Sequence, residues 1–215
     1  MATTTDLETE KRLAAEAAAL LVEDGMRVGL GTGSTVAYLL PALAARRLQL
    51  TCVATSVNTE RVARELGLHL VPFENLARLD VAIDGADQIS PSGWLVKGGG
   101  AAHTREKIVA AAAERFVVIA SSDKLVDALI APIPVELLPF GVDATLSALA
   151  PARLRDVPPS PDGNLIADYF GPVGDPAELA GRLSATAGVV EHGLFPPELV
   201  ADVLLGRGNG VERTR

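Results

Sequence analysis

The chain has 215 residues, of which 48% are hydrophobic and 21% charged, and its formal net charge is −8 with a sequence pI near 4.9. This length can bury a sizeable core, as one large domain or as a main domain with a smaller one. The acidic balance argues against wholesale binding to nucleic acid or to an anionic membrane, and no run approaches the ~20 apolar residues that a membrane span needs.

Helices and strands alternate along the first 121 residues. Periodic patterns predict helices over 7–22, 36–47, 58–67 and about 104–115, and strands over 27–30, 50–55, 68–72, 79–84 and 116–121. Pro41 is expected to kink or restart the second helix, and Gly67 to close the third. Such alternation predicts a parallel sheet within a doubly wound α/β layer.

The pattern changes from about Ala128. The predicted order is now strand 134–140, helix 143–150, strand 153–157, strand 165–170, helix 176–188 and strand 189–195. This βαββαβ order is the split βαβ or ferredoxin-like arrangement, and a strand at 201–207 is expected to return to the first sheet. We therefore expect an α/β domain of residues 1–128 and 201–215, with a smaller α+β domain of residues 129–200 inserted near its end.

Ligands of open α/β sheets bind beyond the carboxyl ends of the strands, so the segments after the predicted strands are candidates for chemistry. The first is GTGST, residues 31–35, between a strand and a helix. Its glycines let the backbone approach a ligand, and amides at the helix start favour an anion. It lacks the lysine of a Walker A loop, and Val36 stands where a dinucleotide fingerprint has its third glycine. The motif alone fits phosphate binding and a tight strand-to-helix turn equally well.

Two carboxylates, Asp84 and Asp87, stand at the end of the predicted strand 79–84. Unpaired carboxylates are costly to bury, so the pair points to metal binding, to sugar hydroxyls or to proton transfer. No third ligand clusters with them and the three histidines show no ligand spacing, which disfavours a metal. The alternative is a helix cap or a turn hydrogen bond, the commonest use of aspartate.

The segment VKGGGAAHTREK, residues 96–107, combines a lysine, three glycines and, in the first turns of a predicted helix, Glu106. Only four of the nineteen basic residues are lysines, and two of them, Lys97 and Lys124, stand at predicted strand ends. A chain that otherwise uses arginine is expected to keep lysine where a compact ammonium is required. Taken singly, Lys124 also fits a surface charge, and Glu106 a solvated helix residue.

Cys52 is the single cysteine, so no intramolecular disulfide can form and a reducing cytosol is the expected setting. Its place in the apolar run LTCVAT predicts a buried strand residue. The apolar stretch from Ala14 to Val22 is interrupted by Glu16, which is typical of a helix face and not of a signal peptide. These features predict a cytoplasmic protein.

Four motifs in order, GLGTGSTV, IDGADQI, KGGGAAHTREKIVA and ASSDKLV, resemble those of the type A family of ribose-5-phosphate isomerases. The resemblance runs from the N-terminal helix through PVELLPF to GVVEHGLF and covers nearly the whole chain. It implies a Rossmann-like domain with a smaller α+β domain, assembled as a homodimer or homotetramer. The implied reaction is the interconversion of D-ribose 5-phosphate and D-ribulose 5-phosphate without a metal or an organic cofactor.

The resemblance also implies roles for individual residues. Glu106 is the general base, and Lys97 with the glycine run stabilises negative charge on the substrate oxygens. Asp84 and Asp87 bind hydroxyls and transfer protons during ring opening, in an order that the sequence leaves open. GTGST and Lys124, together with Lys11, hold the phosphate. The implied substrate-binding residues are Lys11, Thr32, Gly33, Ser34, Thr35, Asp84, Gly85, Ala86, Asp87, Lys97, Gly98, Gly99, Gly100 and Lys124.

Two positions depart from the family pattern. Gln88 stands where glutamate is common after DGAD, and His103 stands where an aliphatic residue is frequent. Alternatives on the same fold are a sugar-phosphate deaminase and a coenzyme A transferase, whose glutamate would attack an acyl group. A non-catalytic sugar-phosphate sensor would be expected to lack these carboxylates and lysines or to carry a DNA-binding domain. A nicotinamide-binding module fits GTGST least well.

Overall fold

The computed structural model describes residues 4–214, apart from the side chains of Thr5 and Asn75. Its contacts form two compact units. The first unit comprises the chain up to Ala86, Arg105–Lys124 and the chain from Glu198 onward; the second comprises Asp87–Thr104 and Leu125–Pro197. Residues 87–104 thus group in space with the second unit, while the domain boundaries expected from the sequence stay a prediction.

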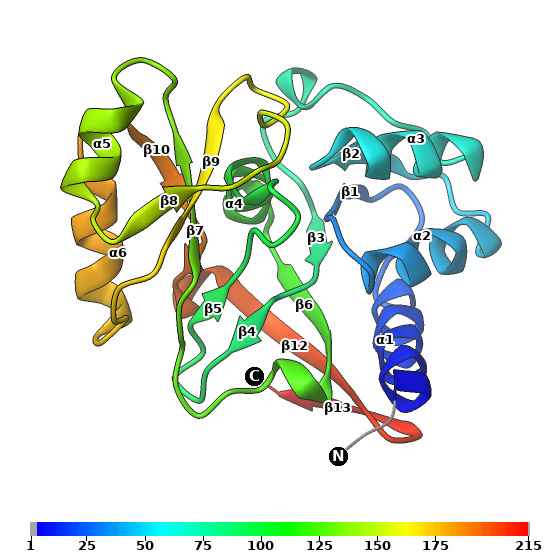
Figure 1. The fold of residues 1–215 in the computed structure, drawn as a ribbon. Helices are drawn as coiled ribbons and strands as arrows, with labels where there is room; N and C mark the ends of the chain where they lie inside the picture. The colour runs from blue at the N-terminus through cyan, green and yellow to red at the C-terminus, as the bar shows by residue number, and fades with distance from the viewer. Residues whose placement is uncertain (1–3, 215) are drawn as a thin grey trace. The chain divides into compact units, whose positions relative to one another are not determined.

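A six-stranded sheet forms the centre of the first unit (Figure 1). Its strands, in the spatial order β13-β12-β6-β3-β1-β2, are Gly210–Thr214, Val200–Arg207, Phe116–Ser121, Val81–Asp84, Arg27–Leu30 and Thr51–Ala54. Every neighbouring pair is parallel except β12 and β13. The predicted parallel sheet is therefore confirmed, and β12 returns to it beside β6 as expected.

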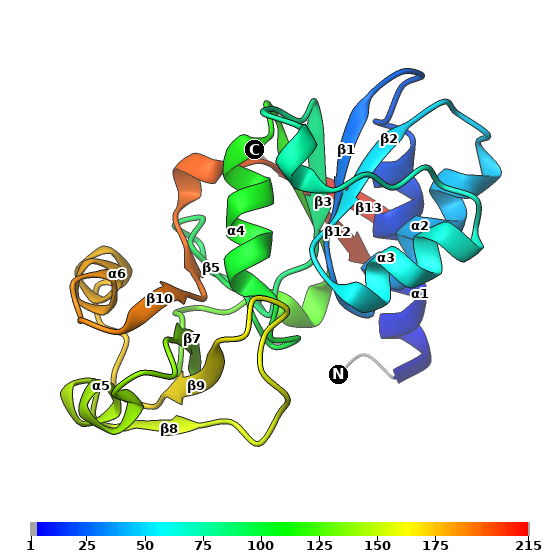
Figure 2. The ribbon, with the colours of Figure 1, turned by 90° about the horizontal axis from the view of Figure 1, so that it is seen from above.

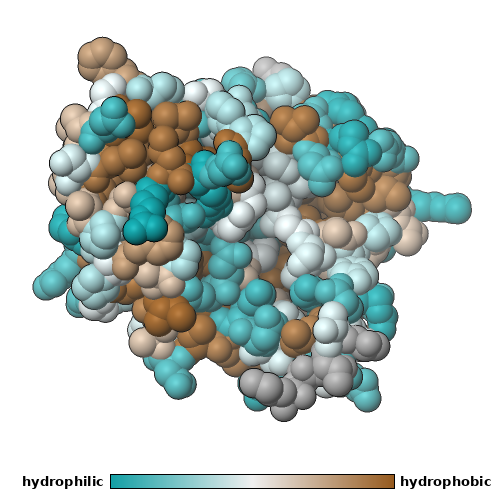
Figure 3. All heavy atoms as spheres, viewed as in Figure 1, coloured by the Kyte–Doolittle hydropathy of each residue, from teal (hydrophilic) through white to brown (hydrophobic). Residues whose placement is uncertain are grey.

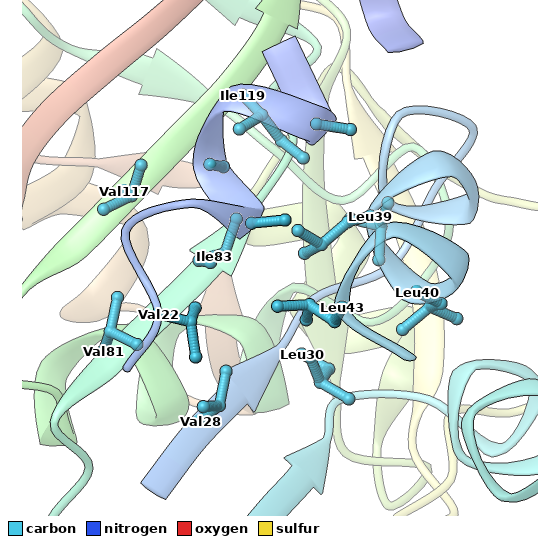
Figure 4. Packing of buried hydrophobic residues seen from close by; sticks show 14 of the residues in the cluster. Val22, Val28, Leu30, Leu39, Leu40, Leu43, Val81, Ile83, Val117 and Ile119 are labelled. Carbon is cyan, nitrogen blue, oxygen red and sulfur yellow. The ribbon is translucent and has the colours of Figure 1, made fainter. Parts of the chain in front are cut away.

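Helices cover this sheet on both faces. They are α1 Thr4–Ala19, α2 Val36–Ala45, α3 Val57–Glu65 and α4 His103–Ala112. Apolar side chains at alternate strand positions, such as Val28 of β1, pack with Leu39 and Leu43 of α2 (Figure 4). On the opposite face, a side chain at Gly29 would collide with Val109 of α4, so glycine lets that helix pack directly on β1. Burial on both faces explains why the strands are almost entirely apolar.

Two antiparallel sheets form the second unit. The elements of the larger one are β7 Ile133–Leu137, α5 Val142–Ala148, β8 Ala152–Leu154, β9 Leu165–Tyr169, α6 Pro176–Ser184 and β10 Val189–His192. The predicted βαββαβ order is confirmed, and the strands lie in the order β10-β7-β9-β8 with α5 and α6 on one face (Figure 2). The smaller sheet contains β4 Gln88–Ile89, β5 Leu95–Val96 and β11 Leu194–Phe195. Short 3-10 helices are η1 Phe73–Asn75, η2 Ser122–Lys124 and η3 Pro197–Leu199.

One prediction about local structure is wrong, and of the two outcomes expected at Pro41 the restart does not occur. Residues 68–72 do not form a strand, because they pair with β2 at one bridge only, between Leu70 and Cys52. Pro72 ends this segment and has no amide that could extend the ladder. Helix α2 also runs through Pro41 without restarting, because buried leucines on both sides of the proline anchor it to the core.

Candidate active site

The carboxyl ends of β1 and β3 lie side by side where the strand order of the sheet reverses. From β1 the chain continues to β2 on one side, whereas β3 pairs with β1 on the other. The ladder pairs Leu30 with Ile83, and the amide of Gly31 donates to the Ile83 carbonyl, so Gly31 and Asp84 are neighbours. Open α/β sheets bind ligands at such a reversal. The first unit therefore brings GTGST and Asp84 together.

Asp84 is buried, with 3% of the residue exposed, and is fixed by backbone amides. Its Oδ1 accepts hydrogen bonds from the amide of Thr32 at 3.0 Å and from the amide of Gly85 at 2.7 Å. A side chain at Gly31 would collide with this carboxyl group, which explains the first glycine of GTGST. The Thr32 amide is thus already occupied by Asp84. Gly85 and Ala86, the next predicted site residues, follow it and are partly exposed.

The rest of GTGST keeps the features of an anion site. The amides of Gly33, Ser34 and Thr35 donate no hydrogen bond to any residue from 4 to 214, and Thr35 does not cap α2 with its side chain. The Thr32 hydroxyl lies 2.8 Å from the hydroxyl of Thr55, which follows β2, and so turns toward the neighbouring strand end. Uncommitted amides at the start of a ten-residue helix attract a phosphate or carboxylate. Thr32 therefore supports the loop, while the amides of residues 33–35 keep their hydrogen-bonding capacity.

Lys11 lies on α1 and Lys124 on the loop after β6, and hydrogen bonds to Glu10 connect these two segments. Lys124 ends η2, just after β6, and its Nζ lies 3.4 Å from Asp123; Lys11 on α1 is bound to Glu8 at 2.7 Å. The carboxylate of Glu10 accepts from the Ser122 amide at 2.8 Å, from the Ser122 hydroxyl at 2.7 Å and from the Gly208 amide at 2.8 Å. The buried Glu10 thus fixes α1 to the loop that carries Lys124.

Glu10 gives a testable pH dependence of stability. Burial tends to raise the pKa of Glu10, but the hydrogen bonds from Ser122 and Gly208 outweigh it and lower the pKa below its ordinary value of 4.5. Ionised Glu10 therefore stabilises the fold fully above that pH, and the stabilisation is lost as the pH falls through the folded-state pKa. We expect Glu10→Gln to lower the free energy of unfolding at pH 7 by about 1–3 kcal/mol and to flatten its fall below pH 4.5.

Urea unfolding at several pH values measures this effect. Glu16→Gln is the matched control, because Glu16 lies on the same helix and makes only an exposed ion pair with Arg12. Equal stability of Glu10→Gln and Glu16→Gln across this pH range would contradict the role given to Glu10.

In the second unit, Lys97 is buried, with 2% of the residue exposed. It follows β5, its amide donates to the Gly193 carbonyl at 2.8 Å, and its Nζ lies 5.5 Å from the centre of the Phe195 ring. An ammonium is costly to bury, and an aromatic face lowers that cost. A buried lysine at a strand end is therefore unusual for a purely structural residue and fits a functional one.

The glycine run after Lys97 is held in a defined shape. Gly98 has φ 101°, and a side chain there would come within 2.7 Å of His103 Nδ1 and 2.9 Å of Pro134. The Gly99 amide donates to Asp87 Oδ2 at 2.8 Å. Asp87 is exposed, in contrast to the buried Asp84, so the two carboxylates have different surroundings. The second unit thus brings Asp87 and the glycine run together.

Glu106 lies in the first turn of α4 and is buried, with 4% of the residue exposed. A solvated helix residue, the alternative considered for it, is therefore excluded. Two residues before Glu106, the Thr104 hydroxyl donates to Glu136 at 2.5 Å. Glu136 is itself buried and also accepts from Ser160 at 2.6 Å and Asn164 at 2.9 Å. This network anchors the start of the helix that carries Glu106.

Several positioning residues were missed from the sequence. Thr55 and Thr59 support GTGST through hydroxyls, and Glu10 and Glu136 anchor neighbouring segments. Only Thr55 and Thr59 had a sequence signal, since Thr55 ends a predicted strand and Thr59 lies in the segment that follows it. Cys52 is buried as predicted, and burial raises its pKa to about 12, so it is not a reactive thiol.

Within residues 4–214, no three His, Cys, Asp or Glu side chains are grouped so that they could hold a metal ion. Among the described helices, none has the length and apolar character required to cross a membrane.

Comparison with known proteins decides the family. The family model of ribose 5-phosphate isomerase A (phosphoriboisomerase A) matches residues 51–210. The chain belongs to this family. The ribose-5-phosphate isomerase A of Gluconobacter oxydans is 44% identical over 225 aligned positions, which cover 97% of each chain.

Solved structures of the ribose 5-phosphate isomerase A family have the same fold. That of Methanocaldococcus jannaschii superposes with a TM-score of 0.90 at 36% identity, covering 95% of this chain and 97% of the other. A D-ribose-5-phosphate isomerase solved in complex with phospho-erythronic acid also gives a TM-score of 0.90, at 34% identity, covering 97% and 99%. The fold of this chain is therefore that of the family, an α/β fold with a mostly parallel six-stranded sheet and smaller antiparallel sheets.

Gln88 and His103, the two residues that depart from the pattern of the ribose 5-phosphate isomerase A family, each fit their local contacts. The Gln88 side chain donates to the Ile130 carbonyl and accepts from the Ile130 amide, both at 2.8 Å. A glutamate could accept but not donate there, so glutamine suits this contact. His103 is fully buried and packs close to Gly98.

Proposed function

We propose that this chain interconverts D-ribose 5-phosphate and D-ribulose 5-phosphate, with Glu106 as the base that moves the proton. The observation that carries the proposal is the burial of Glu106 and Lys97, a carboxylate and an ammonium of the kind this reaction needs, in a chain of this family. Active sites are where proteins keep ionisable groups in such surroundings.

The chemistry follows from these two groups. An aldose–ketose isomerase removes a proton from C2, beside the C1 aldehyde, and returns a proton to C1. The Glu106 carboxylate accepts the C2 proton, the C–H electron pair forms the enediolate, and Glu106 then donates the proton to C1. The Lys97 ammonium and an amide of the glycine run stabilise the negative charge that develops on the oxygens. The proton exchanged between the two oxygens balances the reaction.

We assign the other predicted site residues to separate parts of the substrate. We assign the phosphate to residues 33–35, whose amides are uncommitted, with Lys124 and Lys11. Because Asp84 Oδ1 already accepts two amides, we assign Asp84 to holding the loop and binding a hydroxyl. Asp87, which is exposed and binds one amide, is assigned to the proton transfer of ring opening.

The direct test supplies purified, chelator-treated protein with ribose 5-phosphate and measures ribulose 5-phosphate. Conversion is expected without added metal or cofactor. Well-folded protein that makes no ribulose 5-phosphate under these conditions would refute the proposed function.

Lys124→Ala is expected to raise KM by about tenfold, because a partly exposed phosphate contact contributes about 1.4 kcal/mol of binding, while kcat changes little. Steady-state kinetics with ribose 5-phosphate measure both constants. A loss confined to kcat would move Lys124 from phosphate binding to the chemical step.

We further propose that the first unit is a Rossmann-like catalytic domain and the βαββαβ sheet a ferredoxin-like one, in a cytoplasmic homodimer or homotetramer. The buried free thiol of Cys52 supports the cytoplasmic location.

Apolar side chains exposed on the second unit support assembly into an oligomer: Phe140 is 93% exposed, and Leu138 and Val190 lie at the same end of the sheet. Figure 3 shows apolar surface where Figure 1 places β9 and β10. Light scattering should give a multiple of 22.3 kDa.

A further inference from the structure

We propose that Arg155, held by Asp168, is a positioning residue that fixes the orientation of the glycine loop, residues 98–100, and directs the amide of Gly100 to the substrate. This inference rests on the proposed function, because it assigns that amide to the oxygens of the enediolate. Arg155 lies 55 residues beyond the loop in sequence and had no sequence signal.

The Arg155 guanidinium is committed to protein atoms on every nitrogen. Its Nη1 donates to the carbonyls of Gly98 at 3.0 Å and Gly99 at 3.2 Å. Its Nε donates to Asp168 Oδ2 at 3.0 Å, and its Nη2 donates to Asp168 Oδ1. The pair is mostly buried, with 19% of the Arg155 side chain and 15% of the Asp168 side chain exposed. A bidentate ion pair that is largely buried from solvent holds the guanidinium in one orientation.

The two bonds to carbonyls determine where the next amides point. In a planar trans peptide the C=O and N–H groups point in opposite directions, and no cis bond occurs in this loop. The Gly98 carbonyl faces Arg155, so the Gly99 amide points away from it and is accepted by Asp87 at 2.8 Å. By the same geometry the Gly99 carbonyl turns the Gly100 amide away from Arg155. That amide donates to no residue within 4–214, and Gly100 is exposed whereas Gly98 is buried, so the Gly100 amide is a donor that a ligand can reach.

A glycine run needs such a restraint because it has little conformational preference of its own. Gly98 takes a positive φ of 101°, and Ala101, which is not glycine, takes φ 60°. Glycine loses more backbone entropy on ordering than any other residue, so an untied loop would populate other conformations. The segment from Arg155 to Asn164 restrains both ends of the region, since Asn164 and Ser160 bind Glu136, which holds Thr104.

The test compares Arg155→Ala, Arg155→Lys and Asp168→Asn with Arg153→Ala. Arg153 is the matched control, because it lies on β8, is exposed and contacts the Phe170 ring but not the glycine loop. Loss of one oriented oxyanion donor is expected to lower kcat of Arg155→Ala by about 10²-fold with KM changed less than about threefold. Arg155→Lys keeps the positive charge but loses the planar guanidinium that donates to several acceptors at once, so its kcat should lie between that of Arg155→Ala and that of the native chain.

Ligand binding separates orientation of the loop from general structural damage. Phospho-erythronic acid carries both a phosphate and a carboxylate, and the carboxylate resembles the enediolate in charge and planarity. We expect Arg155→Ala to weaken its binding by about tenfold or more, the loss expected for one oriented donor, while inhibition by inorganic phosphate stays unchanged.

Native kcat and native affinity for phospho-erythronic acid in Arg155→Ala would overturn the inference. An equal loss for phospho-erythronic acid and inorganic phosphate would also overturn it, because that is the signature of a structural role. If Arg155→Ala does not fold, the same two measurements, binding of phospho-erythronic acid and inhibition by inorganic phosphate, are made on Arg155→Lys and Asp168→Asn and test the inference in its place. A native chain that makes no ribulose 5-phosphate refutes the proposed function itself, a result distinguishable from native behaviour in the Arg155 variants.

Discussion

Replacing Glu106 by glutamine is expected to lower kcat by about 10²–10⁴-fold and to change KM much less. Glutamine has nearly the same shape and fits the same buried position in the first turn of α4. It cannot accept a proton at neutral pH, so the variant keeps the packing and loses the base. Steady-state kinetics with ribose 5-phosphate, measured with the thermal unfolding midpoint, distinguish the two effects.

Glu60→Gln is the matched control for this experiment. Glu60 is an exposed residue of α3 that pairs with Arg64 on the same helix, so its replacement should leave both kcat and the midpoint nearly unchanged. A Glu106→Gln variant with native kcat would remove Glu106 from the chemical step.

Replacing Lys97 by methionine is expected to lower kcat by about 10²–10³-fold, the usual cost of one lost oxyanion stabiliser. Methionine keeps the apolar stem against Phe195 and removes the ammonium, so the fold should persist. The thermal unfolding midpoint shows whether the variant has kept its fold. Kinetics and thermal unfolding on the same protein measure both.

Lys97→Arg tests whether charge alone is sufficient. A guanidinium is larger and planar, and the site leaves only 2% of the residue exposed, so arginine should restore little of the lost kcat. Native activity in either Lys97 variant would mean that the buried ammonium is not used in the reaction.

Much of the fold could be predicted from local patterns. The apolar strands β1, β3 and β6 follow from runs such as FVVIAS, and the βαββαβ order from the alternation of periods. Elements whose sequences show no hydrophobic periodicity were not predicted. Strands β4 and β5 have two residues each, too few to show alternation, and β13 at the sheet edge is polar. Residues 68–72 have a strand composition, but they meet the sheet at a single bridge.

The candidate site was predictable where strand ends carry unusual residues. Lys97 was selected in this way, whereas Glu106, on a predicted helix, was assigned its role only by the family resemblance; the structure shows both to be buried. How neighbouring groups share their hydrogen bonds could not be predicted. That Asp84 occupies the Thr32 amide depends on the pairing of β1 with β3, and that Arg155 holds the glycine loop depends on packing across the second unit. Such contacts join residues 52 and 57 positions apart, and no local pattern encodes them.

The most direct test of proton transfer by Glu106 follows ribose 5-phosphate by NMR in D2O, with the native chain and Glu106→Gln in parallel. The native chain should form ribulose 5-phosphate, with deuterium at C1 in those turnovers in which the carboxyl proton exchanges with solvent while the enediolate is bound. Glu106→Gln should not do so at a comparable rate. Ribulose 5-phosphate formed at the native rate by Glu106→Gln would contradict the mechanism, whereas the share of deuterium at C1 in the native product measures only how fast the carboxyl proton exchanges with solvent.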